Sequence, residues 1–188
     1  MSKQDEIEAV VEAILFASPD PVAPDKLIEL FGDKEAATVE DALAAVAERY
    51  REGPHRGVVF ERVAGGVRLI TRPALHGELR KFFEITGRSR LSMAALETLA
   101  IVAYRQPVTA PEIQEVRGVN ASGVLRTLLE RRLVRIAGRK PVVGKPFLYR
   151  TTREFLMHFG LQSLDDLPPL EEFEELMSEP EAETGDDA

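Results

Sequence analysis

Residues 91–153 have the sequence LSMAALETLAIVAYRQPVTAPEIQEVRGVNASGVLRTLLERRLVRIAGRKPVVGKPFLYRTTR. Apolar residues in its first part recur at helical spacing, at Met93, Leu96, Leu99, Ala100 and Ala103. This spacing predicts an amphipathic helix over residues 92–105, capped by Ser92 and buried through that stripe. Pro107 ends the helix, because proline lacks the N–H that an internal helical turn needs.

Two shorter helices and two strands are predicted next. Thr109 can cap a helix over residues 111–116, in which a first-turn proline loses no hydrogen bond. Asn120 can cap a third helix over residues 121–132, which buries three leucines, Leu125, Leu128 and Leu129. Strands follow over 133–136 and 147–150, around a basic loop, and then a closing helix. Three helices and a hairpin in this order indicate a winged helix, a module that contacts DNA or protein.

The first 86 residues have the same order of elements, with no visible repeat of sequence. Helices are predicted over residues 5–17, 24–31 and 34–51, strands over 58–63 and 67–71, and a closing helix over 73–83. The strands are joined by Ala64-Gly65-Gly66, where glycines permit the positive φ of a tight turn. The short second helix is expected to bury Leu27, Leu30 and Phe31. The closing helix is expected to bury Leu75, Leu79, Phe82 and Phe83.

The predicted fold is α+β, mainly α, with tandem winged-helix (helix-turn-helix) domains and small β-hairpin wings. Charge divides the chain into three parts. Residues 1–86, an N-terminal winged-helix domain, carry 11 basic and 16 acidic side chains. Residues 87–160, a C-terminal winged-helix domain, carry 13 basic and 5 acidic ones, and residues 86–90 form the linker. Residues 161–188 carry 11 acidic side chains and no basic one, so an acidic, largely disordered tail is predicted after a brief turn at residues 163–167.

The basic middle part has two readings that the sequence leaves open. In the first, the basic residues bind an anionic partner. In the second, they form a solvated face whose charge is balanced by the acidic tail. A helix-turn-helix places its second helix in the major groove, here the helix predicted over residues 121–132. The candidate partner or DNA surface consists of Arg126, Arg131, Arg132, Arg139, Lys140 and Lys145.

Two features weaken the DNA-binding reading. Gly123 at the start of this helix leaves few base-reading side chains, and arginine stems also cover apolar surface. The corresponding helix of the first half is rich in Glu and Asp, which repel phosphate. A winged helix that does not bind DNA usually docks protein.

Several kinds of active site are excluded. The chain has no cysteine, which rules out disulfides and suits a cytosolic protein. The three histidines lie in separate predicted elements, so they do not assemble the roughly four ligands of a zinc site: His55, His76 and His158. Gly144-Lys145-Pro146 fails as a phosphate loop, because its spacing from Gly138 is wrong and proline replaces Ser or Thr. We therefore predict no enzyme and no catalytic, cofactor-binding or metal-binding residues.

The chain is also not expected to enter a membrane. Its polar start is unlike a signal peptide, and the longest apolar run of the first helix, residues 13–17, is far below the roughly 20 residues of a membrane span.

Many short runs of the sequence resemble the segregation and condensation protein B (ScpB) family. In the second half these are LS (91–92), ETLAIVAY (97–104), QPV (106–108), EI (112–113), RGVN (117–120), GVLRTLLER (123–131), LV (133–134), GRK (138–140), GKP (144–146) and LY (148–149). They continue as TT (151–152), EFL (154–156), FGL (159–161) and SLDDLP (163–168), and the first half adds IEAVVEAILFA (7–17) and GG-RL around residues 65–69. The resemblance covers residues 5–170.

The resemblance implies tandem winged helices and a homodimer formed through the N-terminal domains. It implies binding to the bacterial kleisin ScpA and, through it, to the Smc ATPase. Such a complex acts in chromosome condensation and partition during cell division, so a cytoplasmic, nucleoid-associated protein with weak, non-specific DNA contact at most is expected. The alternative is a dimeric winged-helix transcription regulator that uses residues 121–132.

Overall fold

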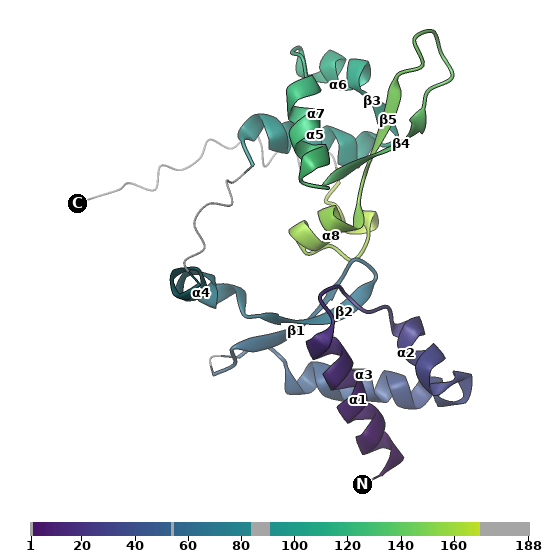
Figure 1. The fold of residues 1–188 in the computed structure, drawn as a ribbon, viewed down its shortest axis with the longest axis vertical. Helices are drawn as coiled ribbons and strands as arrows, with labels where there is room; N and C mark the ends of the chain where they lie inside the picture. The colour runs from purple at the N-terminus through teal and green to yellow at the C-terminus, as the bar shows by residue number, and fades with distance from the viewer. Residues whose placement is uncertain (1, 54, 84–90, 170–188) are drawn as a thin grey trace, which may run out of the picture.

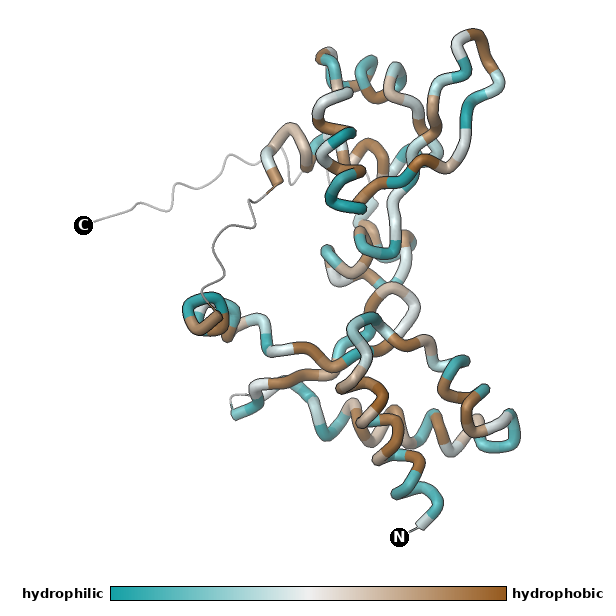
Figure 2. The backbone as a smooth tube through the Cα atoms, viewed as in Figure 1, coloured by the Kyte–Doolittle hydropathy of each residue, from teal (hydrophilic) through white to brown (hydrophobic). Residues whose placement is uncertain are grey.

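The computed structural model describes residues 2–53, 55–83 and 91–169 of the chain, which form an α+β fold made mainly of helices (Figure 1). The buried apolar residues form two cores that share no residue. One core draws on residues 7–67 and the other on residues 95–155. We call residues 3–82 the N-terminal module and residues 93–166 the C-terminal module. Figure 2 shows hydrophobic stretches in the helices of both modules.

Three helices build the N-terminal core. They are α1 (Lys3–Ala17), α2 (Pro24–Phe31) and α3 (Ala36–Arg49), with a 3-10 turn η1 (Asp33–Glu35) before α3. Ser2 and Asp5 form a capping box that satisfies the first N–H groups of α1. α2 has the predicted bounds, but only Leu27 of its three expected core residues is buried. Leu30 is 60% exposed, because it lies on the face of this short helix turned away from α1 and α3.

A hairpin of β1 (Val58–Val63) and β2 (Gly66–Thr71) follows α3. Its two turn residues, Ala64 and Gly65, both have positive φ, 51° and 68°, which is the twist that a two-residue hairpin turn requires. Gly66 is needed for a different reason. A Cβ atom there would lie 3.0 Å from the Pro21 Cβ and 3.0 Å from the Val22 carbonyl oxygen. The close approach belongs to a β-bridge between Val22 and Val67.

The closing helix of the N-terminal module does not bury the residues expected of it. It consists of a 3-10 turn η2 (Pro73–Leu75) and helix α4 (His76–Phe82). Phe82 is 80% exposed and Phe83 is 62% exposed. The prediction of burial was wrong because α4 extends away from both cores, as Figure 1 shows, and no described element covers its apolar side. The predicted linker, residues 86–90, lies outside the described residues.

The C-terminal module begins with α5 (Met93–Arg105), and Ser92 caps it as predicted. Its buried face is turned from the predicted stripe. Ala95, Leu99, Val102 and Ala103 are buried, whereas Met93 and Leu96 are exposed. The stripe was misplaced because Ala95 and Val102, four before and three after Leu99, share its face of the helix.

The next elements are β3 (Val108–Thr109), α6 (Ala110–Arg117) and α7 (Ser122–Glu130). The two-residue strand β3 was not predicted. Thr109 caps α6 within a capping box, as expected. α7 is shorter than the predicted 121–132. The prediction that Asn120 caps it was wrong, because Ala121 is the N-cap residue and no side chain caps the helix. Asn120 instead stabilises the turn before α7, where its Oδ1 accepts a hydrogen bond from the Ser122 N–H at 2.8 Å.

Strands β4 (Val134–Arg139) and β5 (Phe147–Thr151) complete a three-stranded antiparallel sheet of order β3-β5-β4. Helix α8 (Arg153–Phe159) and a 3-10 turn η3 (Leu164–Asp166) follow; the turn lies within the predicted residues 163–167, and Ser163 caps it. Leu167 then packs on the C-terminal core, and the Tyr104 hydroxyl donates to the Pro168 carbonyl at 2.7 Å. The predicted disordered tail beyond this point lies outside the described residues.

The segment around α8 lies between the two modules (Figure 1). The Ala64 N–H in the β1–β2 turn donates to the Leu161 carbonyl at 2.7 Å. The Arg153 Nη2 donates to the Pro21 carbonyl at 2.8 Å. These two bonds join the N-terminal hairpin region to α8.

Candidate partner-binding surface on the C-terminal module

The β4–β5 hairpin brings two arginines face to face. In the antiparallel register Arg135 lies directly opposite Arg150, and both side chains are exposed. Like charges directly opposite each other on one face of a sheet are destabilising. Within the described residues neither arginine forms an ion pair. The pair therefore presents uncompensated positive charge, which an anionic group would offset.

Sequence reasoning did not place Arg150 in the candidate set. The strand containing it was predicted, but its pairing with Arg135 depends on the register of the two strands. The register shifts between Ile136 and Gly138, where a β-bulge interrupts the ladder. Without that register, no sequence pattern singles out Arg150.

Two predicted residues, Arg139 and Lys145, come together at the far end of the hairpin. The Arg139 guanidinium lies 3.9 Å from the centroid of the Phe147 ring, and its Nη1 donates to the Lys145 carbonyl at 2.9 Å. Arg139 therefore fixes the loop by a cation–π contact and a hydrogen bond. The Lys145 side chain remains exposed.

The loop between these residues is apolar at its tip. Val142 is 47% exposed and Val143 is fully exposed, and the hairpin extends beyond the rest of the module (Figure 1). The surface thus combines basic sides with a small apolar end.

Lys140 has a structural role. Its Nζ lies 2.5 Å from the Glu112 Oε1, and the other carboxylate oxygen accepts from the Thr109 N–H and hydroxyl at 2.8 and 2.7 Å. These bonds, chiefly the one from Lys140, lower the pKa of Glu112 to about 2. The network joins the hairpin to the start of α6, so the charge of Lys140 is already paired within the chain.

The three candidates on and after α7 lie apart from Arg139 and Lys145 in the hairpin. The Arg126 Nε donates to the Glu130 carboxylate at 3.0 Å, an exposed i, i+4 pair that partly neutralises this face. Arg131 is exposed and interacts within the chain. Arg132 has a positive φ of 59° and ends the helix, and its carbonyl accepts the Thr152 hydroxyl at 2.5 Å. The charges of Arg126 and Arg131 are therefore less available than those of Arg135 and Arg150 in the hairpin.

Helix α1 of the N-terminal module presents an acidic rather than a basic surface. Arg49 of α3 forms ion pairs with Glu8 and Glu12 of α1, and the Tyr50 hydroxyl donates to Glu12 at 2.6 Å. The bond from Tyr50 is the main cause of the lowered pKa of Glu12. These groups line an acidic surface depression with Asp5 and Phe16. Phosphate would be repelled there.

Other kinds of site find no support in the described part of the chain. No group of three or more His, Cys, Asp or Glu residues is placed there to hold a metal. All three histidines are exposed and lie in a loop, in α4 and in α8. None of the helices described is long and apolar enough to cross a membrane.

Comparison with known proteins identifies related chains. The model of a family described as segregation and condensation complex subunit ScpB matches residues 9–170. The segregation and condensation protein B of Syntrophotalea carbinolica is 49% identical over 178 residues, which cover 94% of this chain and 88% of that protein. The protein of the same name from Symbiobacterium thermophilum is 46% identical over 164 residues, or 86% and 73% of the two chains. The crystal structure of ScpB from Mycobacterium tuberculosis is 35% identical, covers 86% of this chain and 99% of that one, and has a TM-score of 0.40.

Proposed function

The chain belongs to the family of segregation and condensation complex subunit ScpB, and we propose that it is a non-catalytic subunit of a bacterial condensin-like complex. In that role it acts in chromosome condensation and partition during cell division. The observation that carries the proposal is the identity of 49% to a segregation and condensation protein B over 94% of the chain. The proposal also places the protein in the cytoplasm at the nucleoid, where such a complex acts.

We propose that the two modules are tandem winged-helix domains, residues 1–86 and 87–160, followed by an acidic tail over residues 161–188. The order of three helices and a hairpin in each module supports this reading. The two separate cores support a division between them.

We infer a homodimer formed through the N-terminal domains, with the kleisin ScpA as partner and the Smc ATPase bound through it. Family resemblance supports these partners. Exposed apolar residues on α1 and α2 support protein contact by the N-terminal module, since Phe16 is 82% exposed and Leu30 is 60% exposed.

Direct DNA contact, where it occurs, is weak and non-specific in this proposal. The uncompensated Arg135–Arg150 pair, with Lys145, is the surface best placed to contact phosphates. Contacts of this kind release counterions, so the affinity falls steeply as salt rises. Removal of the residues after Pro169 deletes nine carboxylates and should strengthen this binding.

A transcription regulator is not favoured. Its recognition helix would be α7, which begins with Ser122 and Gly123 and pairs its Arg126 with Glu130. In the equivalent α3, Arg49 is paired with Glu8 and Glu12 of α1. Neither helix offers a set of base-reading side chains.

Copurification from the native cell tests the main proposal. A tagged copy of the chain should recover a kleisin and an Smc protein, and the purified protein should show no ATP turnover above background. Absence of both partners from the tagged complex would contradict the assignment.

The hairpin can be assigned to DNA or to kleisin by one double variant. Arg135→Glu with Arg150→Glu should abolish binding to random DNA while kleisin affinity, measured by calorimetry, stays the same. Loss of kleisin binding with an unchanged circular dichroism spectrum would instead make the hairpin part of the protein interface.

The kleisin site is proposed to lie on folded surfaces rather than on the end of the tail. Truncation after Ser178 should therefore leave kleisin affinity unchanged within about threefold, or roughly 0.7 kcal/mol. Loss of the complex on this truncation would show that the docking surface lies in the tail.

A further inference from the structure

Helix α4 carries an uncovered aromatic face. The rings of Phe82 and Phe83 meet edge to face with centroids 5.0 Å apart, and the two side chains are 80% and 62% exposed. Leu79, one turn earlier, is only half-buried. A helix of seven residues is marginal in water without packing. An apolar cover on this face would therefore stabilise α4.

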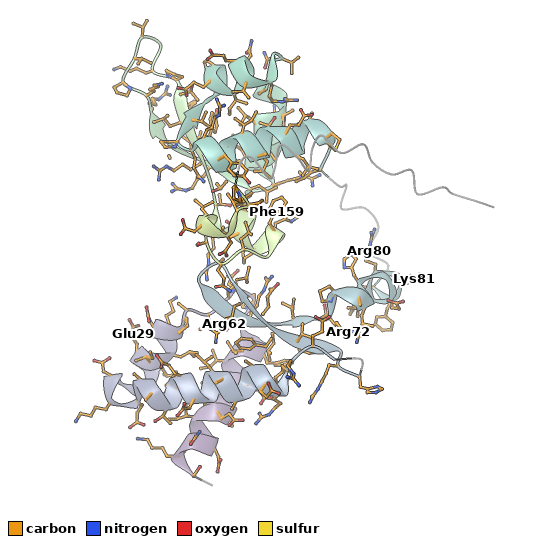
Figure 3. All side chains as sticks on the ribbon, turned by 180° about the vertical axis from the view of Figure 1, so that it is seen from behind. Glu29, Arg62, Arg72, Arg80, Lys81 and Phe159 are labelled. Atoms are coloured by element: carbon orange, nitrogen blue, oxygen red, sulfur yellow. The ribbon has the colours of Figure 1, made fainter. Side chains whose placement is uncertain are left out.

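The surroundings of this face are basic. Residues 72–83 contain three basic side chains and one acidic side chain. Figure 3 shows Arg80 and Lys81 on α4, apart from the helices of the N-terminal core. Arg72 lies at the start of the arm formed by η2 and α4, where its Nη1 donates to the Gly53 carbonyl at 2.8 Å. A covering segment should therefore combine apolar anchors with acidic residues between them.

One segment of the chain has this composition. Residues 171–177 have the sequence EEFEELM, in which Phe173, Leu176 and Met177 recur at i, i+3 and i+4. Residues 171–188 contain nine acidic side chains and no basic one. The apolar and charged features of this segment are complementary to those of α4.

The segment also has the required reach. Leu91 and Leu167 both pack on the C-terminal core. Eight residue steps separate Phe83 from Leu91, and five separate Pro168 from Phe173, which allow about 29 Å and about 18 Å of extended chain. The segment can therefore extend from that core as far as the linker that joins the core to α4.

We propose that residues 171–177 dock on α4 of the same chain, with Phe173, Leu176 and Met177 against Leu79, Phe82 and Phe83. The intervening glutamates then face the basic residues of the arm. This proposal is independent of the proposed function, because it concerns only two segments of one chain. It gives the tail a defined binding site on the N-terminal module.

The β4–β5 hairpin is the competing basic surface and fits less well. Its apolar tip offers Val142 and Val143, whose area is small beside that of two phenylalanines. Arg139 and Lys140 already contact Phe147 and Glu112, whereas Arg135, Arg150 and Lys145 remain exposed, so apolar area rather than charge separates the two surfaces. The hairpin nevertheless provides a matched control.

Paramagnetic labelling of the full chain tests the contact. Because the chain has no cysteine, Ser178→Cys provides one attachment point for a nitroxide. The label should broaden the amide resonances of Leu79, Phe82 and Phe83 and spare those around Phe16, which is equally exposed on α1. The broadening should be lost on Phe82→Ala with Phe83→Ala, and equally on Phe173→Ala, Leu176→Ala and Met177→Ala together. The second variant leaves α4 itself intact, so loss there is not an effect of unfolding.

Further samples distinguish this contact from docking on the hairpin and from contact between two copies of the chain. Val142→Ala with Val143→Ala should leave the broadening of α4 unchanged, and Lys81→Glu should weaken it. Mixing nitroxide-labelled protein with unlabelled, isotope-enriched protein should leave the α4 resonances sharp. Absence of broadening in the first sample, its loss in the valine variant, or broadening that depends on mixing would each overturn the proposal. The last result would assign the face to a second copy of the chain.

Discussion

Each module has a hairpin that follows three helices, but the two hairpins differ in the charges that lie opposite each other across their strands. In the N-terminal hairpin Glu61 lies opposite Arg68, and the Arg68 Nε donates to the carboxylate at 2.6 Å. In the C-terminal hairpin Arg135 lies opposite Arg150. Arg68 of the first hairpin is thus paired within the sheet, and the turn of this hairpin bonds to the segment after α8. The second extends into solvent with its charge unpaired.

This difference separates a structural use of the hairpin from a binding use. An opposite-charge cross-strand pair stabilises a sheet, whereas a like-charge pair opposes it. Arg135 and Arg150 therefore reduce the stability of the isolated sheet and favour an anionic partner. Three helices precede the hairpin in both modules, so the charge pattern of each hairpin is the better guide to its role.

The largest expected effect on stability comes from substitutions in the two cores, which share no residue. Leu128→Ala removes a fully buried side chain of the C-terminal core and should destabilise that module by about 2–5 kcal/mol. Hydrogen exchange should show lost protection in α5 and α7, with α1 and α3 unchanged. Leu15→Ala in the N-terminal core should give the reverse pattern. Equal loss in both modules would mean that they unfold as one unit.

The fixed position of the N-terminal hairpin is tested at Gly66. Gly66→Ala should destabilise the N-terminal module by about 1–3 kcal/mol, because the new methyl group meets the backbone of residues 21 and 22. Urea denaturation measures the change. Gly77→Ala is the control, since a Cβ atom there meets nothing within 4 Å and alanine favours helix by up to about 1 kcal/mol. A neutral Gly66→Ala would contradict the close packing.

Substitutions that exchange the charge patterns of the two hairpins test the difference between them directly. Arg135→Glu creates an opposite-charge pair with Arg150 and should stabilise the C-terminal module by about 0.2–1 kcal/mol. Binding to random DNA should weaken, and its dependence on the logarithm of salt should become shallower by about one. Arg68→Glu should do the converse in the N-terminal hairpin, costing stability without changing DNA affinity. Equal effects of both variants on DNA would remove the distinction between the hairpins.

The smallest expected effect is the pH dependence due to Glu112. Its pKa is lowered from 4.5 to about 2 in the folded chain, so its contribution to stability is complete above pH 4.5 and is lost as the pH falls towards 2. Since this carboxylate is 40% exposed, water screens the pair with Lys140 and the contribution should stay below about 1 kcal/mol. Glu112→Gln should flatten the acid limb of stability measured by thermal denaturation between pH 5 and 2. An unchanged acid limb would mean that the network is not formed in solution.

Much of the local structure follows from signals that act within a few residues. α2 and β1 have the bounds predicted for them, and Ser92 and Thr109 cap the helices that they were expected to cap. Capping and proline effects depend on the neighbouring backbone alone, so they can be recognised without a tertiary structure. The strand β3 was missed because two residues provide no periodicity.

The features that were not predicted depend on what each element packs against. Helical spacing predicted an apolar face for α4, but it contains no information about whether another element covers Phe82 and Phe83. The basic region after α7 was predicted from composition. Which basic residues are paired and which are exposed depends on strand register and the bulge, since Lys140 binds Glu112 and Arg135 lies opposite Arg150.

The joint between the modules has a consequence for how the chain tolerates mutation. Of the four groups in its two hydrogen bonds, the Ala64 N–H and the carbonyls of Leu161 and Pro21 belong to the main chain. Side chains at those positions can diverge without deleting a donor or an acceptor. Arg153 supplies the one side-chain group, so substitutions there offer a direct route by which evolution could loosen the joint while leaving both cores intact.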